Sequence, residues 1–278
     1  MIWLPVISLA ACAQDKSFTS PAGYDFQKPV TYYMEDELQE ISGIAFENGD
    51  PGLLYAEQDE EGKVFLWKPG EAHAARVDFG KKGDYEDIAI ARDYVIVLRS
   101  DGTLFTFPLL QVKQGKITDT RKWEGLLPKG EYESLYADAE TGQLVLLCKD
   151  SHRDHESGKV SGHVLVLDRH GAITKESDFQ FDPDAVAHYT GKPHKEFKPS
   201  ALTRNPVNGD WYILSSVNKV LVIAGENWQV KDAFPLDPSL FIQPEGIAFD
   251  AHHALYISNE GSKTKAATVF KFPKQGSH

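Results

Sequence analysis

Short apolar runs recur along the whole chain and are separated by Gly, Asp, Asn or Pro. Typical runs are YVIVLRS, LVLLCKD and HVLVLD, in which apolar residues alternate with polar ones or follow one another over four to seven positions. Both patterns are typical of β-strands joined by tight turns. Beyond the first twelve residues, no stretch of helix length has an apolar period of 3.6 residues. The pattern predicts an all-β fold.

The strands belong to a repeat whose units open on a small or acidic residue followed by aliphatic residues. The five openings are SGIAFE at Ser42, EDIAIA at Glu86, ESLYAD at Glu133, SALTRN at Ser200 and EGIAFD at Glu245, at intervals of 44, 47, 67 and 45 residues. Four-stranded propeller blades repeat every ~40–50 residues. We therefore predict a single β-propeller of five four-stranded blades, or of six if the long insertion between the third and fourth units contributes strands.

The fifth unit ends one strand short of a complete blade. The segment DFQKPVTYYM, residues 25–34, has the pattern to supply the missing strand. Pairing of the two chain ends would close the ring and remove an exposed sheet edge. We assign residues 25–273 to the propeller and residues 274–278 to a tail.

Strand parity predicts one polar channel mouth. In an up-and-down blade, the start of the first strand and the end of the second lie on the same face. Glu86, Glu133 and Glu245 should therefore surround the channel mouth. The other residues expected on this ligand face are Ser42, Glu57, Asp59, Arg99, Lys149, Ser200, Asn218, Asn259 and Glu260.

Three carboxylates on one axis need compensation for their mutual repulsion. A hard cation such as Ca²⁺, which takes six to eight oxygen ligands, can supply it, and Glu86, Glu133 and Glu245 are then the metal ligands. Alternatively, the glutamates accept hydrogen bonds from backbone N–H groups or pair with Arg99 and Lys149 in a structural network. A third alternative is that the glutamates contact a substrate, and the sequence leaves all three open.

The ordered series of openings resembles the SdiA-regulated family of bacterial exported β-propellers, which are related to phytase-like and gluconolactonase-like propellers. The segments that carry the resemblance are LQEISGIAF, YEDIAI, GEYESLYAD, KPSALTRNPVNGDWYILSSVNKVLVI and QPEGIAFD, within residues 30–273. The resemblance implies a propeller that can hold a calcium-like ion in its channel, and it implies no settled activity. The second unit departs from the pattern, because it has EDI where EGI is usual and so adds Asp87 near the mouth.

Composition and motifs limit the classes of function that the chain can have. The net charge of −12 excludes a nucleic-acid partner, because phosphate recognition needs a basic face. The chain has no GxSxG, Walker A, HExxH or CxxC motif.

Two further candidates are interpreted as structural. Cys148 lies in an apolar run and is interpreted as a structural thiol. The His-rich segment 149–162 is interpreted as a hydrophilic loop. We therefore expect a binding or scaffold module with a small-molecule or envelope ligand. The rival is a metal-dependent hydrolase of phosphoesters or lactones.

The N-terminus predicts export and lipid anchoring. Residues 1–12, MIWLPVISLAAC, are apolar apart from Ser8 and too short to span a bilayer, although no Lys or Arg precedes them. LAAC resembles a bacterial lipobox, so Cys12 is the expected lipidation site. Residues 13–24 then form a tether. The chain is expected to be a membrane-anchored lipoprotein on the periplasmic or cell-surface side.

Substitution of Cys12 tests this prediction. A Cys12→Ala protein should lose membrane association, because no acyl chain can then be attached. Fractionation of membranes from soluble extract measures the change, and an unchanged membrane fraction would refute lipidation.

Overall fold

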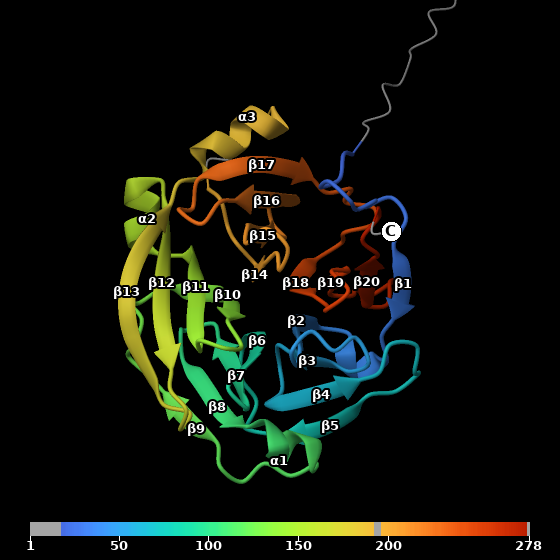
Figure 1. Ribbon diagram of the computed structural model, residues 1–278, viewed down its shortest axis with the longest axis vertical. Coiled ribbons are helices and arrows are strands. Elements are labelled where there is room, and N and C mark those ends of the chain that lie inside the picture. Colours follow the sequence, from blue (N-terminus) through green and yellow to red (C-terminus); the bar gives the residue numbers. More distant parts are fainter. Residues whose placement is uncertain (1–17, 192–195, 277–278) are drawn as a thin grey trace, which may run out of the picture.

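The computed structural model describes residues 18–191 and 196–276. Their strands form five antiparallel four-stranded sheets arranged around one axis, which is the view of Figure 1. This confirms the predicted five-bladed, all-β propeller. The predicted signal segment 1–12, with Cys12, lies outside the described residues. No helix in the described part of the chain is long and apolar enough to cross a membrane.

In blades 1 to 4 the strands run outward from the axis in chain order. Blade 1 contains β2 (Ile41–Phe46), β3 (Leu54–Gln58), β4 (Lys63–Trp67) and β5 (Ala75–Asp78). Blade 2 contains β6 (Tyr85–Ala91), β7 (Tyr94–Arg99), β8 (Leu104–Pro108) and β9 (Arg121–Trp123). Blade 3 contains β10 (Glu131–Ala137), β11 (Gln143–Asp150), β12 (Val160–Leu167) and β13 (Ile173–Phe181). Blade 4 contains β14 (Ala201–Arg204), β15 (Trp211–Ser215), β16 (Val220–Ala224) and β17 (Val230–Pro235).

Blade 5 joins the two ends of the chain. It consists of β18 (Pro244–Phe249), β19 (Leu255–Asn259), β20 (Thr268–Phe272) and, outermost, β1 (Val30–Tyr33). Strand β1 pairs antiparallel with β20, as predicted for the N-terminal segment. Tyr32 of β1 also packs edge-on against Trp67 of blade 1, with ring centroids 5.2 Å apart. The N-terminal strand therefore closes the ring and contacts the next blade.

The hydrophobic core is divided among the five contacts between neighbouring blades. Each contact has its own cluster of buried side chains, such as Ile44 and Tyr256 between blades 5 and 1, or Leu98 and Leu146 between blades 2 and 3. Alternation along each inner strand sends successive side chains to the preceding and the following blade. Each blade is therefore held by two apolar faces, and the inner edges of the inner strands face the axis.

Helices are few and short. They are α1 (Leu109–Lys113), α2 (His152–Ser157) and α3 (Val186–Thr190), with 3₁₀ turns η1 (Asp36–Leu38) and η2 (Pro183–Ala185). The described part of the long insertion forms η2 and α3 and adds no strand, which leaves five blades. Helix α2 replaces the loop expected after β11. Ser151 caps this helix by accepting a hydrogen bond from the Asp154 N–H, and Gly158 ends it in the left-handed conformation.

The segment before β1 is part of the core, which generates a stability prediction. Phe26 is 1% exposed, and its ring lies 4.7 Å from that of Phe272 and 5.7 Å from that of Phe241. Phe26→Ala should lower the free energy of unfolding by about 3–5 kcal/mol, because it leaves a cavity in this aromatic cluster. Tyr33→Ala is the control, since Tyr33 is 74% exposed and should change stability by less than about 0.5 kcal/mol. Urea unfolding measures both, and equal effects would contradict the assignment.

Candidate functional site: the acidic channel mouth

The inner strands enter the channel mouth through β-bulges. In four of the five inner strands the pairing with the second strand skips residues near the start. The skipped residues are Ser42 with Gly43, Glu86, Glu133 and Glu245. A bulge re-aims the side chain of the extra residue. The glutamates therefore leave the alternation that sends other inner-strand side chains into the contacts between blades.

Glu86 and Glu245 interact across the axis. Glu86 belongs to blade 2, yet its carboxyl interacts electrostatically with Lys149 of blade 3 and with Glu245 of blade 5. Blades 2 and 5 are not neighbours in the ring, so this interaction crosses the channel (Figure 1). Glu245 interacts in the same way with Lys149 and with Asp59 of blade 1. The carboxyls expected at the mouth are therefore gathered around one axis.

Lys149 supplies positive charge to all three glutamates. Its ammonium group forms an ion pair with Glu133 and another, at 2.9 Å, with Glu131. The same charge lowers the pKa values of Glu86 and Glu245. Burial outweighs this effect, and the pKa of Glu86 is raised to about 9 while that of Glu245 is also raised. Glu133 thus has a partner in the fold, whereas Glu86 is a neutral carboxylic acid at pH 7.

Glu57 is the most unusual carboxyl of the mouth. It is fully buried, and its Oε1 accepts a 2.6 Å hydrogen bond from the Gly43 N–H. Its Oε2 is buried and has no hydrogen-bond partner among the described residues. Burial, followed by the nearby Asp87 and Asp59 charges, raises its pKa well above the ordinary value. An unpartnered buried carboxyl oxygen is costly, so this atom marks a place where a ligand can bind.

The strand register shows that Glu57 occupies a position that other blades fill with leucine. The matching residues are counted from the pair just before the bulge, which is Ile41 with Gln58 in blade 1. The second-strand residue that precedes this partner is Glu57 in blade 1, Leu98 in blade 2, Leu147 in blade 3 and Ser258 in blade 5, and Leu214, opposite Ala201, has the same place in blade 4. The leucines belong to the clusters between blades. The fold therefore does not need a carboxyl at this position.

Asp59 and Glu260 form the rim between blades 1 and 5. Burial and the neighbouring Glu40 raise the pKa of Asp59 to about 7, and burial and Glu245 raise that of Glu260 to about 7. The Gln243 amide donates a 2.6 Å hydrogen bond to Glu260, whereas the buried Asp59 Oδ1 has no partner among the described residues. Near neutral pH these carboxyls are only partly ionised, and a cation would displace their protons.

Other residues predicted for this face hold the blades together. The Ser200 hydroxyl donates to the Pro244 carbonyl at 3.0 Å, and the Ser42 carbonyl accepts a 2.6 Å bond from the Ser258 hydroxyl. Asp87 has the same task between blades 2 and 3, because its buried carboxylate accepts the Leu135 N–H at 2.7 Å. Gly43 is required here, since a Cβ at this position would collide with Asp87.

The remaining predicted residues serve their own loops. The Arg99 Nε bonds to Asp101 at 3.0 Å rather than to a pore glutamate. Asn218 accepts the Lys198 N–H at 3.0 Å and the Ser215 hydroxyl at 2.7 Å. Asn259 is buried at the end of β19, and neither its Oδ1 nor its Nδ2 has a hydrogen-bond partner among the described residues. Lys219 is an additional cation of the mouth that sequence analysis missed. It interacts electrostatically with Glu245 and donates to the Ile242 carbonyl.

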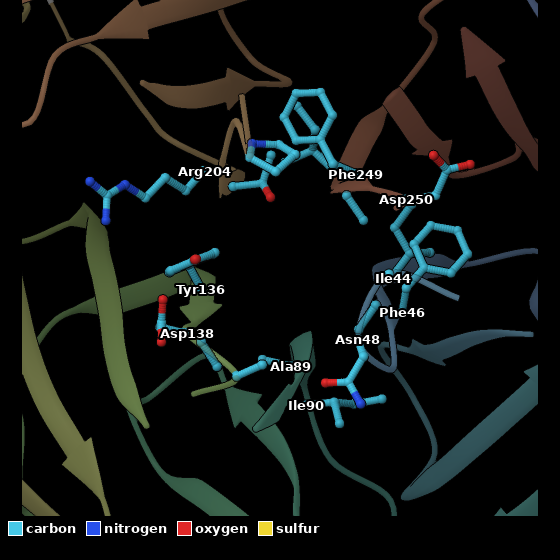
Figure 2. Close-up of a pocket in the computed structure, with 18 of the residues that line it drawn as sticks. Ile44, Phe46, Asn48, Ala89, Ile90, Tyr136, Asp138, Arg204, Phe249 and Asp250 are labelled. Atoms are coloured by element: carbon cyan, nitrogen blue, oxygen red, sulfur yellow. The ribbon is translucent and has the colours of Figure 1, made fainter. Parts of the chain in front are cut away.

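A cavity of about 580 Å³ opens at the other end of the inner strands (Figure 2). Residues from all five inner strands and from the hairpins that follow them line it, including Phe46, Ile90, Tyr136, Arg204 and Phe249. No site is predicted from the sequence at this mouth. A signal was nevertheless present, because the fifth residue of the repeated openings is Phe46, Ile90, Ala137, Arg204 or Phe249.

Comparison with solved structures places the chain among β-propellers. Glutaminyl cyclase from Myxococcus xanthus superposes with a TM-score of 0.58 at 14% identity, over 87% of this chain and 93% of that one. A Thermus thermophilus protein described as an oxidoreductase (glucose dehydrogenase) superposes with a TM-score of 0.53 at 13% identity, over 88% and 100%. At these identities the likeness shows the fold alone. No protein-family model and no curated protein sequence matches the chain.

The raised pKa of Glu86 generates a prediction about pH. A carboxyl with an ordinary value of 4.5 and a folded-state pKa of about 9 binds more protons when folded. Its contribution to stability is complete below pH 4.5 and is lost as the pH rises to about 9. Glu86→Gln should remove this loss, so its stability relative to the natural protein should increase from pH 5 to pH 9 in the presence of a chelator.

Urea unfolding at several pH values measures the difference. Glu176→Gln, which alters an exposed carboxyl in β13, is the matched control and should not change the profile. Parallel pH profiles for the natural and Glu86→Gln proteins would show that Glu86 is not buried as described.

Proposed function

We propose that this chain is a ligand-binding propeller of the bacterial cell envelope and that its acidic mouth is the ligand face, which binds a hard divalent cation such as Ca²⁺. The observation that carries the proposal is Glu57, a fully buried carboxyl with an unpartnered oxygen at a position where three other blades have leucine. The predicted lipidated Cys12, and membership of the SdiA-regulated family, belong to the same proposal.

The chemistry of the donors supports a cation. Glu57, Asp59, Glu86 and Glu245 are close enough to influence one another's pKa values, and carboxylate oxygens are the ligands that calcium prefers. Glu133 is a weaker candidate ligand, because Lys149 already neutralises it. Binding requires the carboxyls to turn toward one ion, since no three acidic, His or Cys side chains of the described residues stand ready to hold a metal.

An alternative function is suggested by one further observation. Glu86, with a pKa of about 9, is protonated at neutral pH, and it interacts with Glu245, which in turn interacts with the partly ionised Asp59 and Glu260. Such a pairing is the arrangement that general acid–base catalysis needs. A cation-dependent hydrolase of phosphoesters or lactones at the same mouth is therefore the second candidate. An activity screen with both substrate classes distinguishes it from a binding module, because only a hydrolase turns over either substrate, and Glu86→Gln should then abolish the turnover.

Calcium titration followed by thermal melting tests the cation site. The natural protein should melt at a higher temperature with calcium than with a chelator, by a gain of about 2.7 kcal/mol when calcium exceeds its dissociation constant a hundredfold. Glu57→Leu should abolish the shift. Without calcium this variant should be folded, because leucine fills the matching position in three other blades and the buried carboxyl is removed.

Glu176→Leu is the matched control, since it makes the same change at an exposed position of β13 and should retain the calcium shift. The proposal fails if calcium leaves the melting temperature of the natural protein unchanged. It also fails if Glu57→Leu responds to calcium as the natural protein does.

A further inference from the structure

The cavity at the mouth opposite the glutamates has three aromatic side chains in a lining that is otherwise aliphatic and polar. Phe46 and Phe249 lie on the side of blades 1 and 5, and Tyr136 lies on the side of blade 3 (Figure 2). Each ring is held from behind by an aromatic side chain of a second strand. Phe46 packs on Tyr256 at 4.8 Å, Phe249 on Tyr212 at 5.2 Å, and Tyr136 on Trp211 at 5.1 Å between ring centroids. Walls fixed before binding favour affinity, because little side-chain entropy is lost.

A column of stacked rings extends the wall of blades 3 and 4. Trp228 lies between Trp211 and Phe179, with ring centroids 4.7 Å and 4.0 Å away and planes within 15° of parallel. The Arg204 guanidinium also lies over the Trp211 ring, 5.5 Å from its centroid. Trp211 is therefore immobilised, and with it the Tyr136 ring that faces the cavity.

The charged groups of the cavity rim already have partners or are hydrated. Asp250 accepts the His252 and Ala254 N–H groups at 2.9 and 2.8 Å. Asp138 accepts the Thr141 hydroxyl at 2.7 Å, and Arg204 bonds to the Gly209 carbonyl and to Glu226 at 2.9 and 2.7 Å. Glu140 is exposed to water. Among the described residues that line the cavity, no charged side chain is both buried and unpaired, which favours an uncharged ligand.

Hydrogen-bonding groups are nevertheless present. Each inner strand is the end strand of its sheet, so its inner edge presents backbone N–H and C=O groups to the channel. Asn48 adds an exposed side-chain amide that has no partner among the described residues, and Figure 2 shows it at the rim near Ile90. These donors and acceptors can form hydrogen bonds with amide and carbonyl groups of a ligand. Ligand pockets commonly combine a few such polar groups with apolar walls.

We infer that this cavity is a second binding site, which takes an uncharged small molecule with a planar apolar body and an amide, amine or carbonyl group. The volume of about 580 Å³ lies within the range of ligand pockets, roughly 300–1,000 Å³. The site is chemically separate from the acidic mouth, because it uses the far ends of the inner strands and no carboxyl of that mouth.

N-Phenyl-1-naphthylamine, an uncharged aromatic amine that fluoresces in apolar surroundings, is a suitable probe. The natural protein should bind it saturably at one site per chain. Ala137→Phe should weaken binding roughly tenfold by filling the cavity. This variant suits the fold, because Phe46 and Phe249 occupy the same place in the repeat. Ala75→Phe, an exposed position in the outermost strand of blade 1, is the control and should bind as the natural protein does.

Asn48→Gly is the second variant and guards against a folding defect in Ala137→Phe. Asn48 has a positive φ of 49°, which glycine adopts freely, so only the amide is lost and binding should weaken several-fold. Glu57→Leu should leave probe binding unchanged. The inference is overturned if the natural protein shows no saturable binding, or if a folded Ala137→Phe protein binds as well as the natural one. It is also overturned if binding falls as the protein self-associates in sedimentation, because a second copy then fills the cavity.

Discussion

Closure of the ring is the constraint on which the rest of the structure depends. Strand β1, near the start of the chain, pairs with β20, near its end. Tyr32 of β1 also packs against Trp67 of the first blade. Only a closed ring brings blades 2, 3 and 5 to one axis, where Glu86, Lys149 and Glu245 interact. The sites at both mouths are products of closure rather than of any single blade, since no blade contains more than a part of either.

The carboxyls of the acidic mouth destabilise the folded protein electrostatically. Carboxyls gathered in a buried space repel one another and lose hydration, which raises their pKa values. Lys149 and Lys219 compensate part of the charge, and protonation of Glu86 removes more. The Glu57 carboxyl has no cationic partner among the described residues; one backbone hydrogen bond and a raised pKa, which favours its neutral form, are its only compensation there. Five apolar clusters between the blades provide the stability that tolerates this arrangement.

The two mouths differ because the same inner strands present different residues at their two ends. Near the start of four of the five inner strands a bulge re-aims a glutamate or serine, and four residues after the start of each repeated opening Phe, Ile, Ala or Arg lines the opposite mouth. This difference underlies our proposals of a cation at one mouth and an uncharged small molecule at the other. Propellers with a likeness to this chain include an enzyme, glutaminyl cyclase, although the likeness extends only to the fold.

The sequence by itself determined the periodic features of this protein. The five openings predicted the number of blades, and the incomplete fifth unit predicted that residues 25–34 supply its last strand, because alternation and repeat length are properties of the local chain. Strand parity also indicated which ends of the strands lie together. The tertiary structure alone decided the bulges, the pairing of Lys149 with Glu133, the burial of Glu57 and the aromatic cavity. These depend on which side chains of neighbouring blades meet, and residues distant in the chain meet only after the ring has closed.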